Sequence, residues 1–158
     1  MANVARRGKD EARQNGKGLT RPKPATKAGR MTDLPPYARL LDLSVVTGDD
    51  GDHVVMPFGD DVLGRPGFLH GGAIAGLLEF AAFTALAKAL GEQRVTTKPV
   101  TITVDYMRGG AEALGDTFAA ALIERLGKRI ANVEAFAWQQ DRTKPIAAAR
   151  INFLLERP

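Results

Sequence analysis

The longest apolar segment of this chain reads HGGAIAGLLEFAAFTALAKAL and spans residues 70–90. Only Glu79 and Lys88 are charged among its residues, and alanine, leucine and glycine supply most of the rest. The segment is too long for a strand, and its composition favours helix. It ends at Leu90-Gly91, a common helix stop. Because it is apolar almost all round, we predict a buried central helix over about residues 69–90.

Strand patterns lie on both sides of this helix. Before it, residues 32–41 predict a short helical turn. Two short apolar runs, residues 43–46 and 53–57, flank a turn-rich stretch and predict a hairpin, and residues 60–67 predict a polar loop. After the helix, four alternating segments joined by turns predict antiparallel strands at residues 100–106, 117–126, 130–138 and 146–155. This order predicts an α+β domain in which a curved antiparallel sheet wraps around one central helix.

The positive charge of the chain is concentrated at its start. The net charge is +4 over 158 residues, yet residues 1–30 carry nine Lys or Arg against two acidic residues, so the remainder is mildly acidic. Large apolar residues are sparse there, which predicts a basic tail, disordered when free, ahead of a folded domain at residues 31–158. No aromatic residue is interleaved for base stacking. We therefore expect no nucleic-acid partner.

Composition also excludes several classes of chemistry. The chain has no cysteine and two histidines, so we expect no disulfide, no thiol nucleophile, no metal site and no cofactor. No uncharged run approaches the roughly 18 residues that would span a bilayer, and the start lacks the apolar core of a secretory signal. We expect a cytoplasmic protein without a membrane partner.

Two features of the central helix bear on function. Glu79 has only Ala75, Gly76, Ala82 and Phe83 within intrahelical reach, so no cation on the helix satisfies it. Such a carboxylate either reaches solvent or another element, or it is functional. His70-Gly71-Gly72 lies where the first helical N–H groups lack acceptors, a place suited to an oxyanion. It also fits a tight loop-to-helix junction with a structural histidine.

Taken together, these features resemble one family. His70-Gly71-Gly72, the carboxylate of Glu79 nine residues later and a strand ending in Tyr106-Met107-Arg108 resemble hotdog-fold thioesterases of the PaaI-like and 4-hydroxybenzoyl-CoA type. The resemblance covers about residues 31–158. It implies hydrolysis of an acyl-CoA, with an aryl or a small to medium acyl group, to free acid and CoA.

The resemblance also implies residue roles. Glu79 matches the catalytic carboxylate, which acts as nucleophile or as base toward water. Gly71 matches the glycine whose N–H polarises the thioester carbonyl, with Gly72 beside it at the substrate, and His70 matches the histidine that shapes the junction. In the family these two parts come from different subunits, which implies a homodimer with shared sites, often paired again into a homotetramer.

Coenzyme A would place its phosphates on basic side chains, for which Arg108, Lys128 and Arg129 are candidates. The aromatic residues of the strands are expected to pack in the core or an interface rather than form the acyl pocket. The chain departs from the family at three positions: Gly64 replaces an Asn or Gln, Pro99 replaces a hydroxyl residue and Phe83 replaces a Thr.

Two other functions on the same fold stay open. A non-catalytic acyl-CoA binding protein is favoured by the missing amide at Gly64. An acyl hydratase or dehydratase would need a histidine in a His-Phe-Pro-Gly context ahead of the helix, and residues 61–64 read Asp-Val-Leu-Gly.

Overall fold

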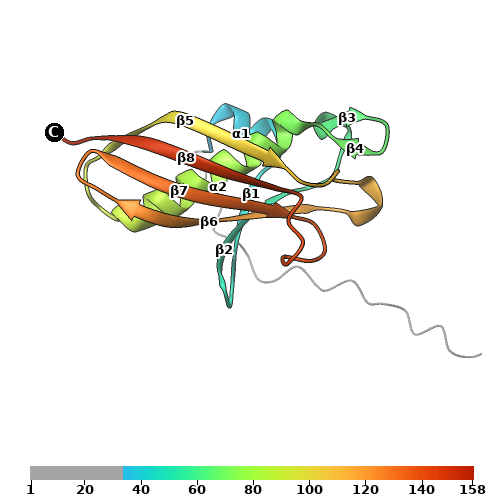
Figure 1. Ribbon diagram of the computed structural model, residues 1–158. Helices are drawn as coiled ribbons and strands as arrows, with labels where there is room; N and C mark the ends of the chain where they lie inside the picture. Colours follow the sequence, from blue (N-terminus) through green and yellow to red (C-terminus); the bar gives the residue numbers. More distant parts are fainter. Residues whose placement is uncertain (1–33) are drawn as a thin grey trace, which may run out of the picture.

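A computed structural model describes residues 34–158 as a six-stranded antiparallel sheet curved around one long helix (Figure 1). The elements are α1 (Pro36–Leu40), β1 (Ser44–Gly48), β2 (Gly51–Met56), β3 (Leu63–Arg65), β4 (Phe68–Leu69), α2 (Gly71–Leu90), β5 (Thr96–Tyr106), β6 (Thr117–Leu126), β7 (Ile130–Trp138) and β8 (Ala147–Glu156). The predicted α+β hotdog architecture is confirmed. The predicted tail, residues 1–30, lies outside the described residues.

The strand order of the large sheet is β1-β2-β6-β7-β8-β5. Strands β6, β7 and β8 form the expected meander, but β5 does not pair with β6, its successor in the chain. It pairs with β8 along nearly its whole length, from Thr96 opposite Glu156 to Tyr106 opposite Ala147. The expectation of short turns joining all four strands was therefore wrong for β5 and β6. Alternation marks which residues form strands, but it does not say which strands are neighbours.

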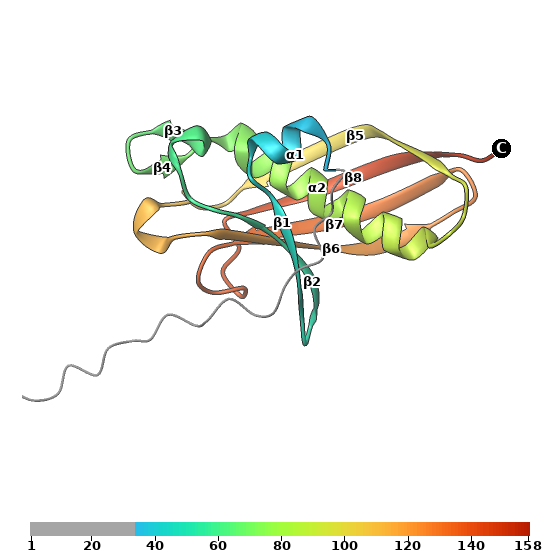
Figure 2. The same cartoon turned by 180° about the vertical axis from the view of Figure 1, so that it is seen from behind.

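Helix α2 packs on the inner face of the sheet (Figure 2). Its buried residues recur three to four positions apart and are Ala73, Ile74, Leu77, Leu78, Ala81, Ala82, Leu86 and Leu90. The opposite face of α2 is only partly buried, although the helix is apolar almost all round. By length and composition α2 could cross a membrane, which corrects the expectation that no segment could, but here it is the core helix of the domain.

Strand β5 forms one edge of the sheet, and its apolar residues are exposed. Val100, Ile102 and Tyr106 keep 56%, 40% and 54% of their surface accessible. They alternate with Thr101 and Thr103, which line the outer face of the sheet, so the apolar set faces the helix side. Because α2 packs mainly on β6 and β7, this part of the inner face remains uncovered.

The elements ahead of α2 differ from the predictions in detail. The hairpin of β1 and β2 is confirmed, with a tighter turn than expected because Thr47 and Gly48 continue β1. The predicted loop at residues 60–67 contains a 3₁₀ turn, Asp60–Val62, and the whole of β3, which pairs with β4. The helical turn predicted near residues 32–41 is α1, which begins after Pro35.

Candidate active site

His70 caps the start of α2. Its Nδ1 accepts a hydrogen bond of 2.9 Å from the N–H of Gly72, and its carbonyl oxygen accepts from Ala73 and Ile74 at 3.0 and 3.2 Å. Within residues 34–158 the N–H of Gly71 has no acceptor. The first turn thus leaves one backbone donor, that of Gly71, directed away from the helix. His70 thus holds the helix start through both its side chain and its carbonyl oxygen.

The structure gives Gly72 a different role from the expected one. Its N–H is already used by the His70 imidazole, so it is not available to a substrate carbonyl. A Cβ atom at position 72 would lie 2.9 Å from Nδ1 of His70, so a larger residue there would displace the capping imidazole. Gly72 therefore serves the cap, and of the two glycine amides that of Gly71 has no acceptor in the described part of the chain.

Gly64 also packs against His70. A Cβ atom at position 64 would lie 2.9 Å from Cα and 3.2 Å from Cβ of His70. The N–H of His70 donates to the carbonyl oxygen of Val62 at 2.8 Å, which holds the loop against the helix start. The absence of the expected amide side chain at Gly64 therefore follows from close packing in this chain.

Glu79 lies two turns further along α2, on the face turned away from the sheet. Among the described residues its carboxylate has no hydrogen bond or ion pair. Burial raises the pKa of Glu79 above its ordinary value of 4.5. The carboxylate borders a pocket of about 160 Å³ between α1 and α2. The pocket is otherwise lined by Pro35, Tyr37, Ala38, Leu43, Gly76, Phe80 and Phe83.

Gly71 and Glu79 cannot reach one thioester within a single chain. Eight residues of α-helix correspond to about 12 Å along the axis. A carbonyl that accepts a hydrogen bond from the Gly71 N–H at about 3 Å is therefore out of reach of the Glu79 carboxylate on the same helix. The structure presents two candidate half-sites, the Gly71 amide and the Glu79 carboxylate, on one helix.

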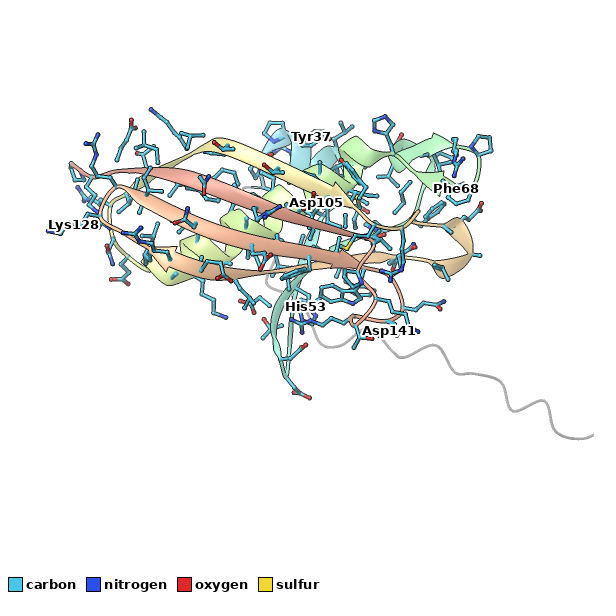
Figure 3. All side chains as sticks on the ribbon, in the orientation of Figure 1. Tyr37, His53, Phe68, Asp105, Lys128 and Asp141 are labelled. Atoms are coloured by element: carbon cyan, nitrogen blue, oxygen red, sulfur yellow. The ribbon has the colours of Figure 1, made fainter. Side chains whose placement is uncertain are left out.

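The predicted phosphate-binding residues do not lie together. Nη1 of Arg108 donates to the carbonyl oxygen of Pro145 at 2.6 Å, near the end of the sheet where β5 meets the start of α2. Lys128 and Arg129 are exposed in the β6–β7 turn, at the other end of the sheet (Figure 3). In one chain Arg108 and the Lys128-Arg129 pair cannot contact the same phosphate group.

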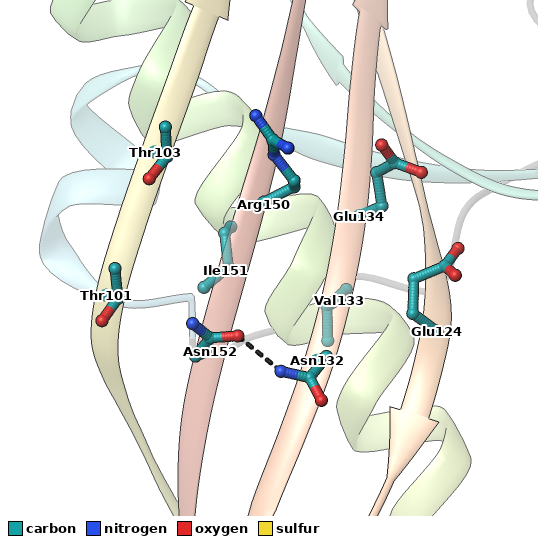
Figure 4. Close-up of a pocket in the computed structure, with 9 residues that line it drawn as sticks. All are labelled: Thr101, Thr103, Glu124, Asn132, Val133, Glu134, Arg150, Ile151 and Asn152. Carbon is teal, nitrogen blue, oxygen red and sulfur yellow. Dashed lines mark hydrogen bonds between the residues drawn. The ribbon is translucent and has the colours of Figure 1, made fainter.

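The outer face of the sheet holds a wider concavity of about 430 Å³, shown in Figure 4. Most of its lining is polar and comes from β5 to β8, and Asn132 donates a hydrogen bond of 2.6 Å to Asn152 across its floor. Since α2 lies on the opposite face of the sheet, neither half-site reaches this concavity. We place the active site on the helix side.

Sequence reasoning did not find two groups of residues at the site. Tyr37, Phe80 and Phe83 form walls of the pocket beside Glu79, and Tyr106 contacts Gly71. Nothing in the sequence distinguishes aromatic residues of the helix that line a pocket from those that pack in the core. Tyr106 was expected to pack in the core or an interface, and its contact depends on where β5 ends relative to α2.

Within residues 34–158 this hotdog fold carries a backbone amide without an acceptor at the start of its central helix and a carboxylate without a partner along it. These are two kinds of group that thioester hydrolysis uses. The model of the thioesterase superfamily matches residues 66–146, just over half of the chain. The chain belongs to the thioesterase superfamily, as the sequence analysis predicted. The comparison with curated proteins returns no match.

Several solved structures are similar to this chain. A protein from Chromobacterium violaceum is 36% identical, with a TM-score of 0.63 over 77% of this chain and 83% of its own. A protein from Bacillus halodurans, solved with CoA, is 22% identical, with a TM-score of 0.70 over 79% of this chain and 81% of its own. A thioesterase from Haemophilus influenzae is 22% identical, with a TM-score of 0.66 over 77% of this chain and 82% of its own. The latter two share the fold.

Replacing Gly64 by Asn tests the packing at the helix start. The new side chain meets the backbone of His70, so we expect a loss of about 1–3 kcal/mol in stability and no gain in activity. Thermal unfolding measures the change. Gly59→Asn is the matched control, because a Cβ atom there has no neighbour within 4 Å. A Gly64→Asn variant as stable as the wild type would contradict this packing.

Glu79 should make stability depend on pH. Because burial raises its pKa, the ionised carboxylate opposes folding at neutral pH, and this penalty vanishes below pH 4.5, where the group is protonated in both states. We expect Glu79→Gln to unfold at a higher temperature than the wild type at pH 7 and at the same temperature near pH 4. Glu124→Gln, an exposed carboxylate on β6, should show no such difference. Equal melting temperatures for Glu79→Gln and wild type at pH 7 would contradict the predicted penalty.

Proposed function

We propose that this protein hydrolyses the thioester bond of an acyl-CoA at sites shared by two copies of the chain. The observation that carries the proposal is the pair of half-sites on α2. The Gly71 N–H has no acceptor among the described residues, and the Glu79 carboxylate has no partner there and borders an apolar pocket. Each supplies one part of a thioesterase, and neither can complete the other within one chain.

The reaction follows from these groups. The Glu79 carboxylate either attacks the thioester carbonyl carbon or removes a proton from a water molecule that attacks it. The carbonyl oxygen becomes an oxyanion that the Gly71 N–H stabilises, aided by the positive end of the helix dipole. The carbon–sulfur bond then breaks, the CoA thiolate leaves and takes up a proton, and one water is consumed to give the free acid.

Pairing of two copies through β5 is supported by the exposed edge of the sheet. Val100, Ile102 and Tyr106 form an accessible apolar row on the helix side of β5, a feature that single subunits seldom leave open. In a twofold pairing of the β5 edges, each copy covers the apolar row of the other, because such interfaces use the same surface on both copies. It also turns the α2 of one copy toward the Glu79 face of the other.

The same pairing bears on coenzyme A. Two antiparallel β5 strands reverse the direction of the second copy. Lys128 and Arg129 of one subunit then lie at the end of the dimer where the other subunit presents Gly71 and Arg108. This arrangement would allow cations of both subunits to contact one CoA, which the separation in a single chain does not. The fold of the CoA-bound Bacillus halodurans protein is consistent with such a ligand.

The acyl group is proposed to enter the pocket beside Glu79. Its volume of about 160 Å³ and its wall of aromatic and aliphatic side chains suit one aromatic ring or a short to medium chain. A dry apolar cavity of about 150 Å³ is large enough for benzene. Thus we expect aryl and short or medium acyl-CoA to be hydrolysed faster than long-chain acyl-CoA.

Release of free thiol from a panel of acyl-CoA substrates tests the activity. Glu79→Gln should lower the rate by about 10²-fold or more, because the amide can neither attack nor accept a proton. Glu124→Gln serves as control. If the wild type releases no thiol but binds acyl-CoA, the protein is a non-catalytic acyl-CoA binding protein, the alternative favoured by the missing amide at Gly64.

Two variants at position 71 test the proposed donor N–H. Gly71→Pro removes the proposed donor N–H while keeping a residue favoured at the first helical position, and Gly71→Ala adds a similar Cβ atom but keeps the N–H. We expect Gly71→Pro to be about 10²-fold slower than Gly71→Ala.

Co-expression of Gly71→Pro and Glu79→Gln under two affinity tags isolates dimers that carry one of each chain. If the sites are shared, one of the two sites contains both wild-type groups, so the mixed dimer should recover about half the wild-type rate. Mixed dimers as inactive as either variant alone would overturn the shared site.

A further inference from the structure

Tyr106, the last residue of β5, contacts the first turn of α2. Its hydroxyl donates a hydrogen bond of 2.8 Å to the carbonyl oxygen of Gly71. Its ring lies over Gly71, where a Cβ atom would be 3.3 Å from Cζ of the tyrosine. A side chain from the edge of the sheet therefore reaches the residue that holds the proposed oxyanion donor.

This bond completes a clamp on one peptide group. The carbonyl of the Gly71–Gly72 peptide accepts from Tyr106, and the N–H of the same peptide donates to Nδ1 of His70. Two consecutive glycines have wide backbone freedom, so without such contacts this turn would sample several orientations. With both ends of the peptide bonded, the backbone of Gly71 is restrained and the direction of its own N–H with it. Bonds in series through one peptide also polarise one another.

The strand end that carries Tyr106 is held in place by backbone hydrogen bonds. Tyr106 lies opposite Ala147 in the β5–β8 ladder. The N–H groups of Met107 and Arg108, which follow it, both donate to the carbonyl oxygen of Ile146, at 2.9 and 3.0 Å. The hydroxyl is thus presented from a paired strand end rather than from a free loop.

We propose that Tyr106 is a positioning residue for thioester hydrolysis, which orients the Gly71 N–H by clamping the Gly71–Gly72 peptide together with His70. The inference rests on the proposed function. It adds a residue that acts through Gly71 rather than on the substrate. Because Tyr106 belongs to the β5 edge, the same residue links the oxyanion donor to the surface through which two copies are proposed to pair.

Tyr106→Phe isolates the hydroxyl, because the ring over Gly71 remains. We expect kcat to fall by about 5- to 20-fold, less than the loss of a whole oxyanion donor, while KM for acyl-CoA and the affinity for CoA stay within about twofold. A nonhydrolysable ketone analogue of the substrate, which presents an uncharged ground-state carbonyl, should also bind within about twofold, because the donor acts mainly on the oxyanion of the transition state. Thr103→Val is the matched control, since it removes a hydroxyl from the outer face of the same strand.

A purely structural role would change the melting temperature and KM together with kcat. Unchanged kcat in Tyr106→Phe, or a loss shared equally by Thr103→Val, would overturn the proposal.

Amide hydrogen exchange tests the clamp without substrate. In protein labelled with ¹⁵N, the Gly72 amide of Tyr106→Phe should exchange several-fold faster than in the wild type, while amides in the middle of α2 keep their rates. Unchanged exchange at Gly72 would overturn the clamp even if hydrolysis is found. If the wild type hydrolyses no acyl-CoA, the proposed function fails by the thiol assay, and the assignment of Tyr106 to hydrolysis fails with it.

Discussion

Helix α2 lies on an inner sheet face that carries many small side chains. The buried inner positions of the three central strands include Ala119, Ala131, Ala135, Ala137, Ala147 and Ala149. Alanine also supplies much of the helix stripe that meets them. Small side chains on both surfaces let a long helix pack against a curved sheet without voids. Everything else at the candidate site depends on this packing, because it sets which face of α2 is buried and which remains open.

The open face of α2 carries the chemistry. Since the buried stripe of α2 packs on the sheet, Glu79 is turned toward α1. Burial raises its pKa there, and no residue among 34–158 pairs with its carboxylate. The start of the same helix is held by His70 and Tyr106, and the N–H of Gly71 has no acceptor within residues 34–158. A straight helix keeps Gly71 and Glu79 about 12 Å apart along its axis. A substrate that contacts an amide and a carboxylate of these two kinds at once therefore needs one of them from a second helix.

Periodicity predicted the elements well and their neighbours less well. The apolar run ending at Gly91 predicted α2 to within about two residues, and alternation predicted the later strands, because burial against a core imposes both patterns. The pairing of β5 with β8 could not be predicted, since alternation carries no information on which strand lies alongside. The short β3–β4 hairpin was missed because residues 60–67 contain few apolar positions.

The candidate site, like the fold, could be predicted from the sequence only in part. The residue types and spacing of His70, Gly71 and Glu79 are properties of the sequence, and they were sufficient to indicate a hotdog-fold thioesterase. The resemblance also named Gly71 as the donor, whereas the use of the Gly72 N–H by the His70 imidazole is seen only in the structure. The separation of Arg108 from Lys128, the pocket beside Glu79 and the contact of Tyr106 with Gly71 arise from segments distant in the chain. Local patterns determine which groups a chain carries, whereas only the path of the chain through the sheet decides which of them meet.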